Sequence, residues 1–252
     1  MLSKPTIKYI QSLQHKKFRD EYNCFVAEGP KVVRELLLSS AFNCKAIYAL
    51  KEWADNIDAE TKNAASLKLE IIDEIALSRI AAYTTPNQVV AVFEKKAAKP
   101  GFEVKQHITL VLDGIQDPGN LGTIIRTADW FGIQNIVCAA HTADMYNSKV
   151  VQSTMASLGR VNLIYTDIAK WLKNHQSETI LATTLEGKPV HSLEKLREAI
   201  VIIGNEANGI SDNVLKLSNE KITIRGYGQA ESLNAAVATG IILFSLKEIC
   251  KI

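Results

Sequence analysis

After residue 107 the chain alternates short, nearly continuous apolar runs with stretches of helical periodicity, and this alternation limits the folds it can adopt. Strands buried on both faces appear as continuous runs of Val, Ile and Leu, because helices cover both sides of a parallel sheet. The pattern therefore predicts an α/β fold with a mostly parallel C-terminal sheet flanked by helices. The predicted strands are residues 108–112, 135–140, 161–165, 179–184, 199–203 and 222–224, and the predicted helices are residues 121–131, 150–158, 167–175, 193–198 and 232–249.

The N-terminal part is predicted to form a smaller α/β unit. Pro30 stands at the start of an expected helix, where its missing N–H removes no hydrogen bond. Residues 94–107 are charged, contain Pro and Gly and lack apolar periodicity, which is typical of a linker. We therefore predict a first domain at residues 1–94, a linker at 95–106 and a second domain at 107–252. The strands expected in the first domain are residues 25–27, 46–50, 69–72 and 89–93.

Composition excludes several classes of protein. Apolar residues make up 47% of the chain, which is too many for a disordered protein. The longest nearly apolar run, residues 235–244, falls well short of the ~20 residues that a membrane-spanning helix needs. The first five residues open no apolar segment, so we expect no secretory signal. The four cysteines are scattered without a CxxC pair, which favours a reducing cytoplasm over a disulfide framework or a cysteine-zinc site.

The formal net charge of +2 is unevenly distributed. Residues 1–34 hold more Lys and Arg than Asp and Glu, and Tyr9, His15 and Phe18 stand among these cations. Such a segment suits a polyanionic partner, and aromatic rings between cations suit stacking on RNA bases. A solvated helix face and ordinary packing explain the same residues, so both explanations stay open.

Common nucleotide and metal motifs are missing from the sequence. No GxGxxG follows the first strand of the second domain, and no GxxxxGK[ST] occurs, so neither a dinucleotide fingerprint nor a P-loop is supported. The five histidines form no HxxxH or HExxH pair, and we predict no metal site.

Polar residues and glycines gather after three predicted strands, at residues 113–126, 204–211 and 224–234. Ligands of open α/β sheets bind beyond the carboxyl ends of the strands, and glycines let the backbone approach a ligand closely. Ser232 is well placed to cap the last helix, with Asn234 in its first turn. These three segments are therefore the candidate site.

At these segments the sequence resembles the SpoU (TrmH-like) family of RNA 2′-O-ribose methyltransferases, in the SPOUT superfamily. The first is similar to the family's D-x-x-x-D-P-x-N-x-G-x-x-x-R, the second to G-x-E-x-x-G-[ILM]-S and the third to S-L-N-x-[SA]-x-A-[TAS]-G. One position departs from the pattern, because Arg225 stands where the family usually has Pro. The matching residues are Asp113, Asp117, Pro118, Asn120, Gly122 and Arg126, then Gly204, Glu206, Gly209, Ile210 and Ser211, and finally Ser232, Leu233, Asn234, Ala236, Ala238, Thr239 and Gly240.

The resemblance implies a deep trefoil knot in the C-terminal sheet and S-adenosylmethionine as the cofactor. It also implies a homodimer that shares its active site. The methyl group on a sulfonium is already activated, so no metal is expected. The N-terminal part resembles the αβα substrate domain that precedes many catalytic domains of the family, so RNA is the expected partner. A separate substrate domain favours rRNA over tRNA, and a cytoplasmic location without membrane contact is expected.

Roles for individual residues follow from the same resemblance. Arg126 is the expected catalytic residue; because a guanidinium stays protonated, it would hold the ribose-phosphate and lower the pKa of the hydroxyl rather than act as a free base. The alternative is an arginine paired with Asp129 or Glu206. The other expected catalytic residues are Asn120, Glu206, Ser232 and Asn234, and the expected cofactor-binding residues are Gly204, Glu206, Gly209, Ile224 and Leu233.

Ordinary structural roles compete with several of these assignments. Asn120 is common in turns that follow Pro and Gly, Glu206 is a typical surface carboxylate, and Ser232 and Asn234 are typical helix caps. A tRNA 2′-O-methyltransferase and a non-catalytic protein that binds RNA or the ribosome remain alternative functions. A nucleotide-binding enzyme of another chemistry on the same α/β plan is a third.

Overall fold

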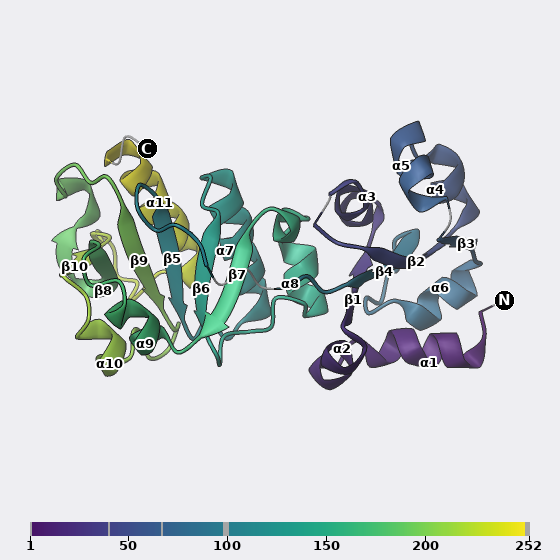
Figure 1. Cartoon of the computed structure of the whole chain (residues 1–252), viewed down its shortest axis with the longest axis horizontal. Coiled ribbons are helices and arrows are strands. Elements are labelled where there is room, and N and C mark those ends of the chain that lie inside the picture. Colours follow the sequence, from purple (N-terminus) through teal and green to yellow (C-terminus); the bar gives the residue numbers. More distant parts are fainter. Residues whose placement is uncertain (1, 40, 67, 98–100, 250–252) are drawn as a thin grey trace. The chain divides into compact units, whose positions relative to one another are not determined.

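Two β-sheets organise the chain, and each belongs to its own compact unit (Figure 1). The computed structural model describes residues 2–39, 41–66, 68–97 and 101–249. The first unit comprises Met1–Ala97 together with Asp144–Arg160, and the second comprises Ala98–Ala143 together with Val161–Ile252. Each unit is described by itself below.

The sheet of the first unit has the strand order β1-β4-β2-β3, with β4 antiparallel to both of its neighbours. On one face, Ile10 of α1 and Leu77 of α6 pack with Val92 of the sheet. On the other, α3 lies against β1 and β4 and buries Leu36. The layers are therefore α, β and α, as the family resemblance implies. The elements are α1 (Lys4–Ser12), α2 (Lys16–Tyr22), β1 (Cys24–Glu28), α3 (Pro30–Leu38), β2 (Cys44–Ala49), α4 (Lys51–Asn56), α5 (Ala59–Ala65), β3 (Leu69–Ile71), α6 (Glu74–Ile80) and β4 (Val89–Glu94), followed later in the chain by α8 (Ser148–Ser153) and the 3-10 turn η1 (Ser157–Gly159).

The segment Asp144–Arg160 packs in the first unit although it lies far along the chain. The ring of its Tyr146 lies 4.8 Å from that of Phe25, centroid to centroid. Helix α8 ends at Ser153, earlier than the predicted helix at residues 150–158, because Met155 and Ala156 have left-handed φ values of 47° and 70°. The first unit thus draws on a stretch that the predicted boundaries assign to the second domain.

Arg19 holds this segment in place rather than facing solvent. Its side chain is 3% exposed, Nε and Nη2 donate to Asp144 Oδ2 at 3.1 and 2.7 Å, and Nη1 donates to the carbonyls of Leu13 and Gln14. One member of the basic N-terminal segment is therefore structural.

Other cations of the basic segment are also partly neutralised. Lys16 of this segment binds Asp20, which also accepts from Lys95 outside the segment, and these hydrogen bonds lower the pKa of the Asp20 carboxyl. Arg34 donates to Asp58. The segment is consequently a weaker attractor of polyanions than its composition suggests.

The second unit is built on a six-stranded sheet with the order β10-β8-β9-β5-β6-β7, in which every neighbouring pair is parallel. The predicted fold class, a mostly parallel sheet flanked by helices, is confirmed; the trefoil knot stays a prediction. The elements are β5 (Ile108–Asp113), α7 (Pro118–Trp130), β6 (Asn135–Ala139), β7 (Asn162–Thr166), α9 (Ile168–Lys173), β8 (Ile180–Pro189), the 3-10 turn η2 (Val190–Ser192), β9 (Ala199–Gly204), α10 (Asp212–Leu215), β10 (Glu220–Thr223) and α11 (Ala235–Ile249).

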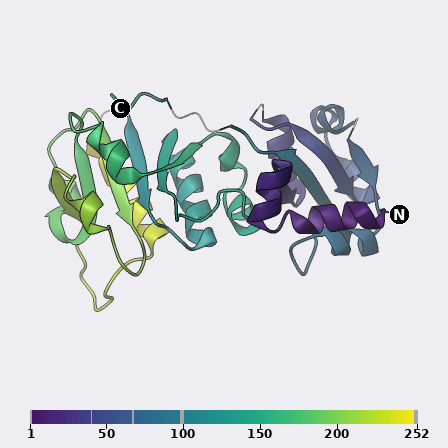
Figure 2. The ribbon, with the colours of Figure 1, turned by 60° about the horizontal axis from the view of Figure 1, so that its bottom comes forward.

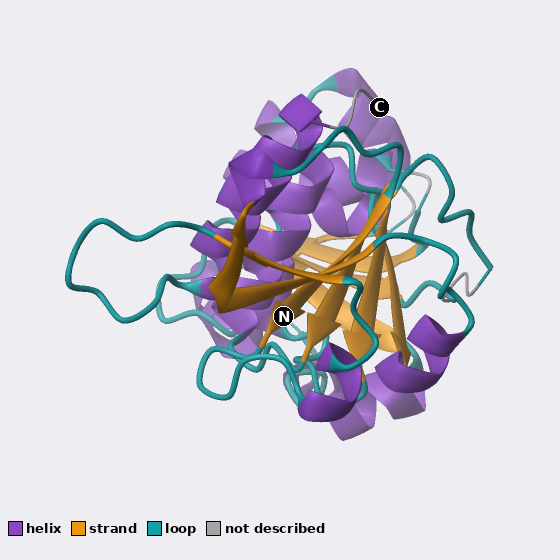
Figure 3. Cartoon of the chain, turned by 90° about the vertical axis from the view of Figure 1, so that its left-hand side faces the viewer, coloured by secondary structure: helices purple, strands orange, loops and turns teal. Residues whose placement is uncertain are grey.

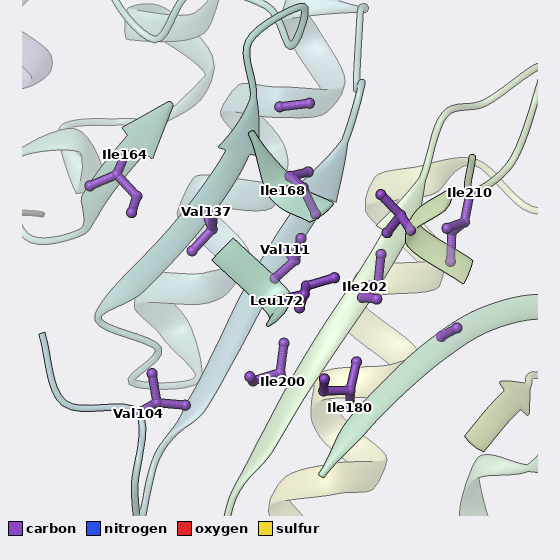
Figure 4. Close-up of a cluster of buried hydrophobic side chains, with 13 residues drawn as sticks. Val104, Val111, Val137, Ile164, Ile168, Leu172, Ile180, Ile200, Ile202 and Ile210 are labelled. Atoms are coloured by element: carbon purple, nitrogen blue, oxygen red, sulfur yellow. The ribbon is translucent and has the colours of Figure 1, made fainter. Parts of the chain in front are cut away.

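Helices lie on either side of this sheet (Figure 3). Helices α7 and α11 contact each other, as do α9 and α10. Leu172 of α9 packs in one cluster with Val111, Ile200 and Ile202 of the central strands, and all four side chains are fully buried (Figure 4). Burial of such side chains stabilises the unit by about 1.5–3 kcal/mol each.

One predicted helix of the second unit is wrong. Residues 193–198 are not helical, because Leu193 is extended with φ −67° and ψ 146° after the short turn η2. The Ser192 hydroxyl donates to the Pro189 carbonyl and closes that turn locally, so no further helical turn is started.

The ion pair between Arg19 and Asp144 generates a stability prediction. Asp144→Ala leaves a buried guanidinium without its counter-charge, so we expect the free energy of unfolding of the first unit to fall by about 3–5 kcal/mol. Urea denaturation followed by circular dichroism measures it. The matched control is Lys45→Ala, which removes an exposed ion pair with Glu94 and should cost less than about 1 kcal/mol. Equal losses in the two variants would contradict the structural role of Arg19.

Candidate active site

The first two candidate segments meet because β5 and β9 are neighbours in register. Asp113 is paired with Gly204, so the loops that follow them leave the sheet at the same level. Helix α7 begins at Pro118, three residues before the predicted start, because the Asp117 carboxylate accepts from the Asn120 N–H at 2.7 Å. Asn120 is thereby held in the first turn of the helix, facing the loop after β9.

A chain of side-chain hydrogen bonds joins the three segments. Asn120 Nδ2 donates to Glu206 Oε1 at 2.7 Å, and Asn120 Oδ1 accepts from Asn234 Nδ2 at 2.9 Å. The amide of Asn120 thus uses both of its ends, one for each partner. Three of the expected catalytic residues, one from each segment, are therefore brought into direct contact.

The cap of the last helix differs from the expectation. Asn234 Oδ1 accepts from the N–H groups of Ala236 and Val237, and α11 starts at Ala235. Ser232 is therefore not the cap, and it makes no hydrogen bond within the described residues. The first N–H groups of a helix have no partner within the helix, and here Asn234 accepts two of them. The helix therefore begins three residues later than predicted.

The loop after β9 is a tight hairpin that only glycine permits at two positions. Asn205 and Gly209 exchange two backbone hydrogen bonds of 2.9 Å, and Gly209 has a φ of 67°. A Cβ at Gly204 would overlap the backbone of Gly209. The hairpin is tied to the loop after β5, because Asn205 Nδ2 donates to the Gly114 carbonyl at 2.7 Å. Asn205 was not among the residues predicted for the site.

Arg126 stands apart from the hydrogen-bonded chain. It is exposed, and neither alternative ion pair, with Asp129 or with Glu206, is formed by it in the part of the chain that the structure describes. Six residues separate it from Asn120 along α7, which is about 9 Å of helix axis and a different side of the helix. A single chain therefore does not bring Arg126 to the other expected catalytic residues.

Residues 225–233, between β10 and α11, are all exposed, and none makes a hydrogen bond to another described residue. Figure 2 shows this yellow-green segment extending away from the body of its unit. Leu233 is 48% exposed, and the Arg225 guanidinium lies 5.6 Å from the centre of the Tyr227 ring. Unpaired backbone groups can form hydrogen bonds with an adenosine, and exposed apolar and aromatic side chains can pack against its ring. These residues therefore suit the expected cofactor. Of the expected cofactor positions, Gly204 and Gly209 lie in the hairpin, and Ile224 and Leu233 lie at the two ends of this segment.

A cavity of about 250 Å³ opens at the carboxyl ends of β5, β6 and β9. His141 covers Gly114 so closely that a Cβ there would overlap the imidazole, and Gly114 has a φ of 82°. Gln116 lies within the candidate segment 113–126 but was not predicted as a site residue, and His141 was not predicted because no glycine-rich segment follows the strand that ends at Ala139. The residues that line the cavity are Asp113, Gln116, His141, Asn205, Asn208, Gly209 and Ser211.

Two further observations bear on the expected partners. Within the described ranges, no group of three or more His, Cys, Asp or Glu side chains could hold a metal ion. No helix formed by the described residues has the length and apolar content to span a membrane.

Family models match both parts of the chain. The SpoU rRNA Methylase family matches residues 107–244, and the MRM3-like substrate binding domain matches residues 4–91.

Similar proteins extend over nearly the whole chain. The 23S rRNA (guanosine(2553)-2′-O)-methyltransferase RlmP of Bacillus subtilis is 32% identical, over 96% of this chain and 95% of the relative. A TrmH-family protein from Porphyromonas gingivalis has a structure with a TM-score of 0.84 and 34% identity, over 98% of each chain. The AdoMet-bound rRNA methyltransferase from Sinorhizobium meliloti has a TM-score of 0.84 and 30% identity, over 98% of this chain and 96% of that one.

These matches confirm the resemblance that the three motifs indicated. The motifs lie in the matched range, and the structure joins them through Asn120. The chain therefore belongs to the SpoU rRNA methylase family.

Proposed function

We propose that the protein transfers a methyl group from S-adenosylmethionine to a ribose 2′-hydroxyl of rRNA. The observation that carries this proposal is the hydrogen-bonded chain Glu206–Asn120–Asn234, which joins the three family motifs at the carboxyl edge of the sheet. The B. subtilis relative is named as a methyltransferase of 23S rRNA, and the S. meliloti relative is described with bound AdoMet.

The cofactor is proposed to bind between the hairpin after β9 and residues 224–234. Bound there, S-adenosylmethionine supplies an activated methyl group on a sulfonium. Gly204 and Gly209 bring the hairpin backbone close, Ile224 and Leu233 offer apolar surface, and Glu206 keeps the hairpin tied to Asn120. Asn234 begins α11 and connects residues 224–234 to the same network.

Arg126 is proposed to act on the acceptor ribose. A 2′-hydroxyl is a poor nucleophile while it is protonated, and a nearby guanidinium stabilises the developing oxyanion and holds the neighbouring phosphate. The O–CH3 bond forms as the S–CH3 bond breaks, S-adenosylhomocysteine leaves, and the hydroxyl proton passes to the phosphate or to water. Because Arg126 has no carboxylate partner among the described residues, its donors stay available for RNA. Its separation from Asn120, Glu206 and Asn234 supports an active site completed by a second copy of the chain.

An apolar face on α11 supports a homodimer. Val237, Ile241 and Phe244 follow one another at i, i+4 and i+7, so they share one side of the helix, and they are 52%, 37% and 59% exposed. Helices α7 and α11 run side by side in the same direction, because Asn120 bonds Asn234 and Thr127 lies against Gly240. Trp130 of α7, which is 85% exposed, therefore stands near the level of Phe244. Exposed apolar groups of this extent favour burial against a second copy.

RNA binding by the N-terminal domain, residues 1–94, joined to the catalytic domain by the linker 95–106, is part of the same proposal. Lys17 lies over the Phe18 ring, and Phe18 stacks on Tyr22, which is 45% exposed. An exposed aromatic ring next to a cation suits single-stranded RNA. With rRNA as the proposed substrate, the cytoplasmic location predicted from the sequence is kept in the proposal.

Replacing Arg126 tests the proposed reaction. In Arg126→Ala and Arg126→Lys, kcat should fall by about 100-fold or more, because the oxyanion loses its planar donor, whereas the Kd for S-adenosylmethionine should change less than about twofold. The assay follows methyl transfer to the 2′-O of rRNA from cells that lack the protein, and calorimetry gives the Kd. The control is Arg197→Ala, an exposed arginine of the same unit outside the motifs. Wild-type protein that binds the cofactor and methylates no RNA ribose would support a non-catalytic RNA-binding protein.

A charge on the apolar face of α11 tests the dimer. Ile241→Glu should convert a dimer into a monomer at micromolar concentration, because the carboxylate would be desolvated in the interface. Light scattering after size-exclusion chromatography measures the mass. The control Leu185→Glu places the same charge on an apolar side chain that is 74% exposed elsewhere in the unit, and it should leave the dimer intact. A variant at residue 241 that keeps the mass of a dimer would contradict this interface.

A further inference from the structure

The cavity at the ends of β5, β6 and β9 has no part in the cofactor binding proposed above. None of its lining residues comes from residues 224–234, and only Gly209 belongs to the proposed cofactor set. Its wall is nevertheless shared with the site, because Asn205, Asn208 and Gly209 line it while the intervening Glu206 bonds Asn120. The hairpin after β9 therefore lines the cavity and also carries one of the proposed catalytic residues.

Part of the polar lining serves the frame of the cavity. Asn205 donates to the Gly114 carbonyl and accepts from the N–H groups of Ala207 and Asn208. The Ser211 N–H and hydroxyl both donate to Asp113 Oδ2, at 2.8 and 2.7 Å. These bonds hold the wall in one shape without a ligand.

Other lining groups keep free hydrogen-bonding capacity. The Asp113 residue is 5% exposed, and its Oδ1 has no hydrogen-bond partner among the described residues, yet that atom is not fully enclosed, so it opens to the cavity that Asp113 lines. The side chains of Gln116, His141 and Asn208 make no hydrogen bond to any described residue. Two amides, one imidazole and one carboxylate oxygen thus surround the space as donors and acceptors.

This chemistry selects the class of ligand. No Lys or Arg lines the cavity, so a phosphate or carboxylate would lack a counter-charge. Amide, imidazole and carboxylate groups match the mixed donor and acceptor edge of a nucleobase. The volume of about 250 Å³ lies just below the ~300–1,000 Å³ of pockets for drug-sized ligands, which suits a single heterocycle.

We propose that this cavity receives the base of the nucleotide that is methylated, and that Gln116, His141 and Asn208 determine which base is accepted. The inference rests on the proposed function. A base turned out of its stack into the cavity would leave its ribose beside the hairpin that carries Glu206, where the proposed catalytic residues lie. The three residues are specificity determinants, whereas Asp113 and Asn205 shape the wall.

Binding of free nucleotides tests the cavity without any methyl transfer. Protein saturated with S-adenosylhomocysteine is titrated with AMP, GMP, CMP, UMP and ribose 5-phosphate, while NMR follows the imidazole signals of His141 and the side-chain amides of Gln116 and Asn208. One base should shift these signals at a concentration at least about fivefold lower than the others, because each bidentate contact discriminates by that order. His191, an exposed histidine outside the cavity, provides the control signal.

Kinetics of variants provides a second, independent measurement. Gln116→Ala and His141→Ala should raise the KM for rRNA at least about fivefold and leave the Kd of S-adenosylmethionine unchanged, with His191→Ala as the matched control. The double variant Gln116→Ala/His141→Ala should also lose the preference among the four nucleotides in the NMR titration.

The outcomes separate this inference from the proposed function. Equal shifts with all four nucleotides, shifts produced by ribose 5-phosphate alone, or no shift at His141 would overturn the base cavity, even if the protein methylates rRNA. Displacement of S-adenosylhomocysteine by the nucleotides would assign the cavity to the cofactor and overturn it as well. Base-selective shifts in a protein that methylates no RNA would instead leave the cavity as a base-binding site only, and would refute both the methyltransferase and the assignment to the methylated nucleotide.

Discussion

The side-chain amide of Asn120 is the interaction on which the rest of the site depends. An Asn amide offers a donor at one end and an acceptor at the other. Here Nδ2 donates to Glu206, and Oδ1 accepts from Asn234. A Gln would carry the same groups one methylene further from the helix, and an Asp could not donate to Glu206. One residue in the first turn of α7 thereby sets the spacing between three loops that are far apart in sequence.

The position of that amide depends in turn on the start of α7. Asp117 caps the helix, and the ring of Pro118 fixes the φ of its first residue. Asn120 is therefore held toward the sheet edge. The facing hairpin is equally constrained, because a side chain at Gly204 would collide with Gly209. Residues 225–233 have no such support within the described chain, and they are the segment for which a cofactor or a second subunit would supply partners.

The N-terminal unit is stabilised by a different kind of contact. Arg19 reaches across the chain to Asp144, and its remaining donors bind the carbonyls that end α1. A residue that belongs by composition to a basic, exposed segment is therefore committed to the interior. The RNA binding proposed for this unit relies on the aromatic and cationic groups that stay exposed, such as Lys17 and Tyr22, rather than on net charge.

The sequence by itself determined the α/β class, the strands of both sheets and three candidate segments. Nearly continuous apolar runs such as residues 108–112, alternating with helical stretches, favour strands covered on both faces, and the family motifs carry their residues at set spacings. The resemblance also gave each motif an expected role, and those roles stay predictions, whereas the contact among Asn120, Glu206 and Asn234 was not predicted.

Only the tertiary structure decided the features that rest on distant contacts. Asn234 replaced Ser232 as the cap of α11, and residues 193–198 stayed out of a helix. Tyr146 and Asp144 joined the first unit, and His141 came to lie over Gly114. Local periodicity contains no information on which loops meet at the edge of a sheet, because strand order brings together residues whose positions in the chain are unrelated.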